Sequence, residues 1–338
     1  MYKRRLYLHI TLQNMLPLDK DLQQKKSSIS EFELVVNRVL LYLPNVLSGF
    51  EEKFGYVLYY STNAGTKKFV RPINKSLFIM DPGEFLLTML EFKNILVKIK
   101  NREGSFSAIE KGLIDSVLYT IQQAMGAGFD LLVDPNSARK HVGNRFEELI
   151  KSVFTEIGIP NKKVVIKIPY DTENGTKDYT CENDLILSPY PNISSNNQRE
   201  EIVLDAENDQ SEELVLSRSA EAAADKYINS QEIVVSVKTT SKDRMGKMFM
   251  DKILLEKFVG HELKVIGIFL NDVQRKETNN ISYTLVSGLF MVYNKFITEL
   301  SGVYYLDPPP NAEIEPYNKY IKRFSELITE DIDGLLSA

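Results

Sequence analysis

The hydrophobic positions of the first 125 residues show two periodicities. In three segments the apolar side chains recur every three to four residues, and short apolar runs flank a turn containing Asn and Gly. These patterns predict helices at about 31–43, 81–100 and 105–123, and a β-hairpin at 56–72. Pro44 is expected to end the first helix, and Gly126 and Gly128 the third. The sequence therefore predicts an N-terminal α+β region spanning residues 1–125.

From residue 126 to residue 338, short apolar runs alternate with helical patterns. Strands are predicted at about 164–168, 185–187, 232–239, 263–270, 281–286 and 303–306, and helices at 142–157, 245–259, before 300 and after 316. The polar, acidic stretch 192–231 is expected to be an exposed insertion with one short strand near 202–204. Because helices and strands alternate, we predict an α/β fold with a mixed central β-sheet flanked by helices.

Composition narrows the class of protein. The 338 residues are 43% hydrophobic and 26% charged, as in a globular protein, and they contain no apolar run long enough to span a membrane. Cys181 is the only cysteine, which excludes a disulfide framework and fits the cytoplasm. Only three histidines occur, which disfavours histidine-rich zinc hydrolases. The net charge of −5 means that any nucleic-acid contact must rest on a local basic patch.

A lysine stands at the end of an otherwise apolar strand. Side chains alternate along residues 232–239, so that Val234, Ser236 and Lys238 share one face. A lysine in this position either extends its amine to water or meets a negative charge. The sequence alone leaves both alternatives open.

The following helix carries a carboxylate among apolar residues. At about 100° per residue, Met248, Leu255 and Phe258 all fall within about 60° of Asp251. This predicts that Asp251 lies in the middle of the buried face, where an unpaired carboxylate is costly. Either Lys238 or a metal ion would compensate for the charge.

Two further acids precede these residues. Asp184 leads into the strand at 185–187, and on its own it is typical of a turn. Glu147 borders the apolar face of the helix at 142–157, whereas Glu148 is expected to point to solvent. Carboxylates near a lysine can hold a hard divalent cation and orient a water, which suits phosphodiester hydrolysis.

A helix carrying Glu147, then Asp184, and then a strand ending in Lys238 resembles the PD-(D/E)XK nuclease superfamily. The usual acid two positions before the lysine is Ser236 here. In this respect the chain is similar to a branch of type II restriction endonucleases that recognise sites built on CCGG, CCNGG or CCWGG. In that branch the acid moves to the next helix, thirteen or fourteen residues after the lysine. Asp251 occupies this position, with aspartate in place of the more usual glutamate.

The resemblance covers about residues 140–310 and implies a nuclease catalytic domain at 126–338. It implies a Mg²⁺ site held by Asp184, Asp251 and Glu147, with Lys238 completing the catalytic set. The same branch carries a basic–acidic–basic triplet that reads C:G pairs, and Lys242-Asp243-Arg244 occupies its place. Arg or Lys can donate to guanine, and Asp can accept from cytosine N4. Lys247 is expected to hold a phosphate.

The predicted function is therefore Mg²⁺-dependent cleavage of both strands of double-stranded DNA at a short palindromic site containing CC/GG. A palindromic site fits a homodimer, alone or paired into a tetramer, in which the N-terminal region supplies dimer or DNA contacts. A DNA methyltransferase is expected as the genetic partner. Two alternatives remain: a structure-specific or repair nuclease of the same fold, and a DNA-binding protein whose catalytic site has decayed.

Overall fold

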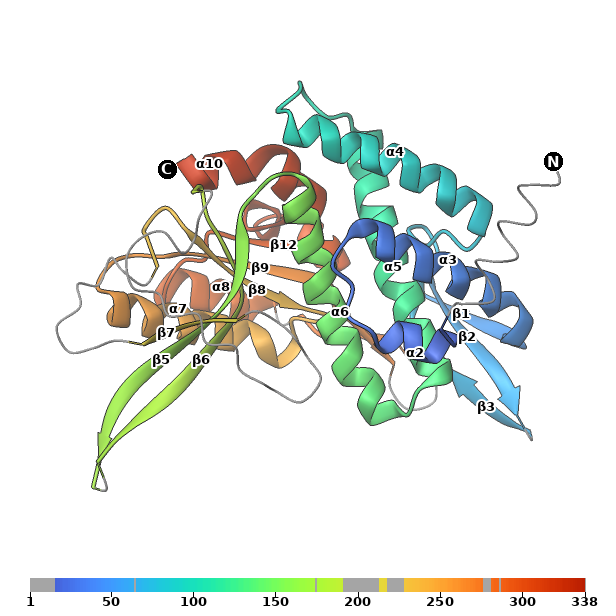
Figure 1. Ribbon diagram of the computed structural model, residues 1–338, viewed down its shortest axis with the longest axis horizontal. Coiled ribbons are helices and arrows are strands. Elements are labelled where there is room, and N and C mark those ends of the chain that lie inside the picture. Colours follow the sequence, from blue (N-terminus) through green and yellow to red (C-terminus); the bar gives the residue numbers. More distant parts are fainter. Residues whose placement is uncertain are drawn as a thin grey trace.

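A seven-stranded mixed sheet forms the centre of the molecule (Figure 1). The computed structural model describes residues 16–63, 65–173, 175–190, 213–217, 228–275, 281–285 and 287–337. The strand order is β13-β12-β9-β8-β6-β5-β7. Strands β8, β9, β12 and β13 run parallel, whereas β6 is antiparallel to both of its neighbours. The strands comprise β5 (Asn161–Thr172), β6 (Gly175–Leu187), β7 (Glu213–Ser217), β8 (Ile233–Lys238), β9 (Lys264–Asn271), β12 (Gly302–Asp307) and β13 (Ile321–Arg323).

Helices cover both faces of this sheet, because its central strands are apolar on both sides. Along β8, Ile233 and Val235 belong to a buried cluster with α5 (Ala108–Leu132) and α6 (Pro135–Glu156). Val234 belongs to the cluster on the opposite face, with α7 (Met245–Val259) and α8 (Ser287–Phe296). The predicted mixed sheet flanked by helices is confirmed.

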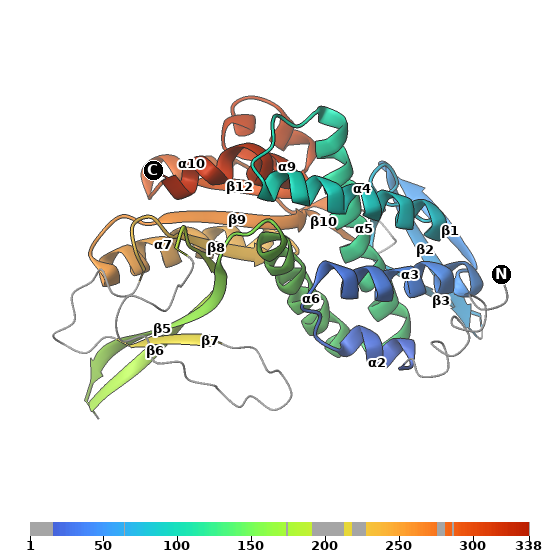
Figure 2. The same ribbon diagram turned by 45° about the horizontal axis from the view of Figure 1, so that its top comes forward.

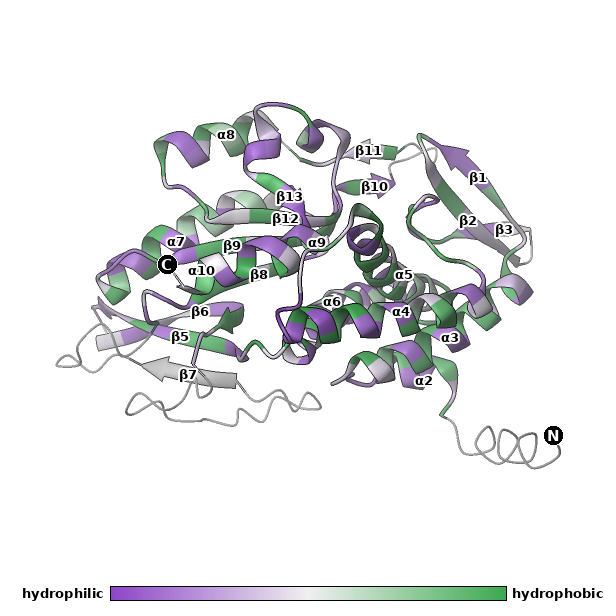
Figure 3. Cartoon of the chain, turned by 90° about the horizontal axis from the view of Figure 1, so that it is seen from above, coloured by the Kyte–Doolittle hydropathy of each residue, from purple (hydrophilic) through white to green (hydrophobic). Residues whose placement is uncertain are grey.

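The N-terminal region combines helices with a small antiparallel sheet, as predicted. Its helices are α2 (Leu18–Gln23), α3 (Ile29–Val46) and α4 (Pro82–Lys100), and its strands are β1 (Gly49–Lys53), β2 (Tyr56–Asn63), β3 (Thr66–Phe69) and β4 (Ile73–Asn74). The expected hairpin is the antiparallel pair β2–β3. Asp81 caps α4 by accepting a hydrogen bond from the backbone N–H of Glu84 at 2.8 Å. In Figure 3, hydrophobic and hydrophilic residues alternate in bands along α3 and α4.

Two predicted helix ends are wrong. Helix α3 continues through Pro44 to Val46, and α5 continues through Gly126 and Gly128 to Leu132. These glycines serve close packing instead, since a Cβ at residue 126 would lie 2.3 Å from Cζ of Arg71. The predicted boundary between residues 125 and 126 therefore falls inside one continuous helix, and a single buried cluster includes residues from both sides of it.

The remaining differences concern short elements. The chain forms the hairpin β10 (Val273–Arg275) and β11 (Ile281–Tyr283), and the C-terminal helical segment consists of α9 (Phe324–Glu326), a π-helical turn at Leu327–Asp331 and α10 (Ile332–Ser337). Strand β13 precedes this segment and was not predicted. The strand expected near 202–204 lies outside the described residues, whereas β7 forms within the same acidic stretch. No helix in the described part of the chain has the length and apolarity needed to cross a bilayer.

Asp115 is a buried carboxylate that ties α5 to the C-terminal helical segment. Its Oδ1 accepts the backbone N–H of Ser325 at 3.0 Å, and its Oδ2 accepts the Ser325 hydroxyl at 2.7 Å. Burial raises the pKa of Asp115 to about 7, against the lowering effect of these hydrogen bonds. The folded protein therefore binds a proton at Asp115 that the unfolded chain releases above about pH 4.

Asp115→Asn is expected to remove a pH-dependent part of the stability. Between about pH 4 and 7 the folded state holds more protons at this residue, so this contribution to the free energy of unfolding falls as pH rises, by at most about 1.4 kcal/mol per pH unit. Denaturant unfolding of both proteins across this pH range measures the effect. The difference in the free energy of unfolding between the wild type and Asp115→Asn should change between about pH 4 and 7 and become constant above about pH 7. A difference that stays the same at every pH would contradict this prediction.

Candidate active site

The site forms where β6 separates from β8. The two strands pair over only three residues, Leu185–Leu187 with Ile233–Val235. Beyond this point β6 continues with β5 as a long hairpin that leaves the body of the molecule (Figure 2). At the separation, Asp184 and Leu185 stand opposite Lys163 alone, which is a β-bulge. The bulge places Asp184 at the fork between the strands.

Three predicted residues meet at this fork. The amine Nζ of Lys238 donates to Oδ1 of Asp184 at 2.7 Å and to Oε1 of Glu147 at 3.1 Å. The other oxygen of Asp184 accepts the backbone N–H of Val237 at 2.8 Å. The sequence left open whether Lys238 extends to water, and in the structure it meets two carboxylates from β6 and α6. This geometry joins an amine and two acids that lie far apart in the sequence.

The proton affinities of this cluster reflect burial and mutual charge. Burial lowers the pKa of Lys238, but Asp184 and Glu147 outweigh it, so that the pKa is raised and the amine stays charged. Burial, followed by repulsion from Asp184, raises the pKa of Glu147 to about 7, although Lys238 opposes this change. Glu147 can therefore gain or lose a proton near neutral pH.

Asp251, on α7, lines a pocket that Asp184 and Lys238 also line. The prediction that it occupies the middle of the buried face is wrong: it lies at the border, with its side chain 24% exposed. The ionisable residue on the buried face is Lys252, whose Nζ donates to Oε1 of Glu256 at 2.7 Å and to the carbonyl oxygen of Leu263 at 3.0 Å. Asp251 pairs with Lys247, one turn earlier, at 2.5 Å. Helical periodicity alone could not show which of these two neighbouring residues lies on the buried face. A lysine can bury the aliphatic part of its side chain, so its charge does not mark the position as exposed.

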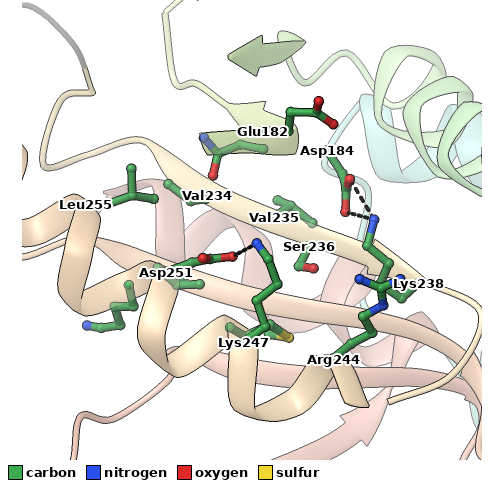
Figure 4. Close-up of a pocket in the computed structure, with 14 residues that line it drawn as sticks. Glu182, Asp184, Val234, Val235, Ser236, Lys238, Arg244, Lys247, Asp251 and Leu255 are labelled. Atoms are coloured by element: carbon green, nitrogen blue, oxygen red, sulfur yellow. Dashed lines mark hydrogen bonds and ion pairs between the residues drawn. The ribbon is translucent and has the colours of Figure 1, made fainter. Parts of the chain in front are cut away.

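The donor atoms fit a hard divalent cation. Asp184, Ser236 and Asp251 all line one pocket of about 180 Å³, and Figure 4 shows the two carboxylates approaching it from β6 and α7. Within the described ranges, no group of three or more His, Cys, Asp or Glu residues is placed to hold a metal. Mg²⁺ is commonly bound by one or two carboxylates, with water and phosphate oxygens completing its shell. Two carboxylates line this pocket, and each is paired with a lysine: Asp184 with Lys238, and Asp251 with Lys247.

The basic–acidic–basic triplet lies directly beside the pocket. Lys242–Arg244 form a short 3₁₀ helix, η2, that leads into α7. Lys242 and Arg244 are exposed, and Arg244 also lines the pocket together with Lys247. Only the backbone of Asp243 is described, so the predicted role of its side chain lies outside the described part of the structure.

Near the site, one residue lies differently from its predicted position and another was not predicted. Glu148 does not point to solvent: it pairs with the buried Arg145, and its Oε2 accepts the backbone N–H of Lys26 at 2.9 Å. Asn183 lines the pocket, is 5% exposed, and its Nδ2 has no hydrogen-bond partner in the described structure. The only feature of the sequence that could have indicated Asn183 as a site residue is its position next to Asp184.

This forked mixed sheet with helices on both faces is the fold of a restriction endonuclease. The chain is similar to the crystal structure of the type IIP restriction endonuclease Kpn2I, with a TM-score of 0.62, 18% sequence identity and 91% of each chain covered. A complex of the restriction endonuclease PspGI with substrate DNA also matches, with a TM-score of 0.35, 15% identity, and 75% of this chain and 92% of that chain covered. No protein-family model and no curated protein matches the sequence.

Proposed function

We propose that this protein is a Mg²⁺-dependent type II restriction endonuclease that cuts both strands of DNA at a short palindromic site containing CC/GG. The observation that carries the proposal is the cluster of Asp184, Lys238 and Glu147 at the fork, with Asp251 lining the same pocket. The Kpn2I fold provides the scaffold on which such a cluster is expected.

The side chains of the fork have distinct roles in this proposal. Asp184 and Asp251 would hold Mg²⁺, and Glu147 would complete the site directly or through a water. When bound, the cation would supply a Lewis acid that lowers the pKa of a water and balances phosphate charge. Lys238 remains charged beside Asp184, so it can orient the attacking water and stabilise the charge that develops on the phosphate. Ser236 serves as a small neighbour rather than a nucleophile.

The exposed turn before α7 would read the DNA. Lys242 and Arg244 can donate to guanine O6 and N7, and Asp243 can accept from cytosine N4. Lys247 would contact a phosphate, either in place of its ion pair with Asp251 or in addition to it. The turn begins four residues after Lys238, so base reading and cleavage would occur side by side.

Arg244→Ala is expected to weaken binding of the cognate duplex by about 1–3 kcal/mol and to relax recognition at one base pair. The reason is the loss of a base-edge donor, whereas contacts with the phosphates remain. Titration of a cognate duplex and of single-mismatch duplexes at fixed salt measures both effects. An equal loss of affinity for unrelated DNA would show that Arg244 contacts phosphate only.

Assembly and cellular context form part of the proposal. A two-fold symmetric site calls for a homodimer, alone or paired into a tetramer. Exposed apolar side chains on the outer faces of the adjoining helices α3 and α4 offer a contact surface: Leu34, Leu41, Leu87, Leu90 and Val97. Sedimentation velocity should therefore show a species of at least twice the 38.7 kDa chain. The protein would act in the cytoplasm beside a DNA methyltransferase that protects the host site.

Digestion of unmethylated phage DNA with Mg²⁺, followed by sequencing of the fragment ends, tests the function. Discrete fragments with a common end sequence would support a restriction endonuclease and reveal its site. A smear or nested nicks would indicate the structure-specific or repair nuclease, and DNA that is bound but intact would indicate a decayed site.

A further inference from the structure

A buried carboxylate outside the pocket, Asp272, anchors the segment between Lys238 and α7. It directly follows β9 and is 0% exposed. Its Oδ1 accepts the backbone N–H of Ser241 at 2.8 Å and the hydroxyl of Thr284 at 2.7 Å. Its Oδ2 accepts the hydroxyl of Ser241 at 2.7 Å and that of Tyr305 at 2.5 Å. These four donors offset the cost of burying the carboxylate.

Ser241 connects this anchor to the exposed turn. It is 1% exposed, and its carbonyl oxygen accepts the backbone N–H groups of Arg244 at 2.7 Å and Met245 at 2.9 Å. These are the hydrogen bonds that begin η2 and α7. Ser241 is therefore fixed by Asp272 through its N–H and hydroxyl, and it fixes the turn through its carbonyl group.

We propose that Asp272 is a positioning residue that, through Ser241, holds the Lys242–Arg244 turn in place relative to Lys238. This inference rests on the proposed function, because it assigns the turn to DNA. The distance between base-reading and water-orienting groups is set by the few residues between them, and a misplacement of about 1 Å can cost about 10²-fold in rate. Two hydrogen bonds that Ser241 donates to one buried carboxylate restrict both translation and rotation of the segment.

One of the other two donors provides a matched control. Tyr305 on β12 also hydrogen-bonds the side chain of Ser241, so its removal would disturb the anchor itself. Thr284, after β11, donates its hydroxyl to Oδ1 of Asp272 and comes from a different segment of the chain. Ser241→Ala and Thr284→Val thus each remove one neutral hydroxyl donor from the same carboxylate. Of these two residues, only Ser241 is bonded to the turn.

The experiment compares the wild-type chain with Ser241→Ala, Thr284→Val and Asp272→Asn. Amide hydrogen exchange over residues 242–251 is followed without DNA, and single-turnover cleavage is measured on the site found by end sequencing and on its single-mismatch variants. Ser241→Ala is expected to speed exchange in this segment and to slow cognate cleavage at least about tenfold, with less discrimination against mismatches. Thr284→Val is expected to leave both readouts within about twofold of the wild type, at a similar loss of melting temperature.

Asp272→Asn should show the larger effect, since its amide N–H₂ would face groups that are themselves donors. If this variant does not fold, the comparison of the other two variants still decides. Equal exchange and equal cleavage for Ser241→Ala and Thr284→Val would overturn the inference. A wild type that cuts no DNA would instead overturn the proposed function, and the exchange comparison would still show whether Asp272 holds the turn.

Discussion

Lys238→Ala is expected to lower the rate of DNA cleavage by about 10²–10³-fold while leaving specific binding detectable. The amine of Lys238 bonds both Asp184 and Glu147. In the proposed mechanism its removal would take away the group that orients water and balances charge on the phosphate, whereas the exposed Lys242 and Arg244 would still face the DNA. Single-turnover cleavage and gel-shift binding on the same duplex measure the two effects.

Lys322→Ala is a suitable control for this variant. Lys322 also lies on a strand of the central sheet, and its Nζ bonds both oxygens of Asp331 at 2.7 and 2.8 Å. The substitution therefore removes a comparable ion pair away from the fork. Cleavage by Lys322→Ala should remain near that of the wild type. If Lys238→Ala retained full cleavage, Lys238 would have no place in the mechanism.

Asp251→Asn is expected to raise the Mg²⁺ concentration needed for half-maximal cleavage by about tenfold or more. An amide is a weaker ligand than a carboxylate for a hard cation, and Asp251 is one of the two main ligands in the proposed site, which Glu147 completes. Cleavage rates across a Mg²⁺ titration measure the shift. Saturating Mg²⁺ should restore part of the lost activity, because the side chain keeps its shape and one oxygen.

The matched variant here is Lys247→Met, which removes the ion-pair partner of Asp251 and keeps the carboxylate. Freed from the lysine, Asp251 should bind the cation at least as well as in the wild type. Asp251→Asn is therefore expected to raise the Mg²⁺ concentration needed for half-maximal cleavage, whereas Lys247→Met is expected to leave it unchanged or to lower it. An unchanged Mg²⁺ titration for Asp251→Asn would count against its proposed role as a ligand.

The sequence identified the strand and helix at the centre of the site. Alternation along β8 and periodicity along α7 gave both elements within one residue of their ends, because strong local patterns specify them. The convergence of Glu147, Asp184 and Lys238 followed from the family resemblance rather than from periodicity. The metal-binding and base-reading roles remain predictions.

Other features depend on contacts between distant segments, which a single sequence does not display. The β-bulge at Asp184 arises from its register with Lys163, and β7 and β13 exist only as partners of longer strands. Glu148 is drawn inward by Lys26, more than a hundred residues earlier. Local pattern cannot specify such positions, because tertiary partners override it.

The unbroken helix α5 has a consequence for the way the two halves of the chain work. A fragment starting at residue 126 would begin in the middle of a helical turn and would lack the buried residues of α5 that precede it, such as Val117 and Leu118. The apolar side chains of α6 in the same buried cluster, such as Phe146 and Leu149, would then lose their cover. Because one helix and one core join the two parts of the chain, we expect the part that carries the fork to fold only together with the N-terminal part.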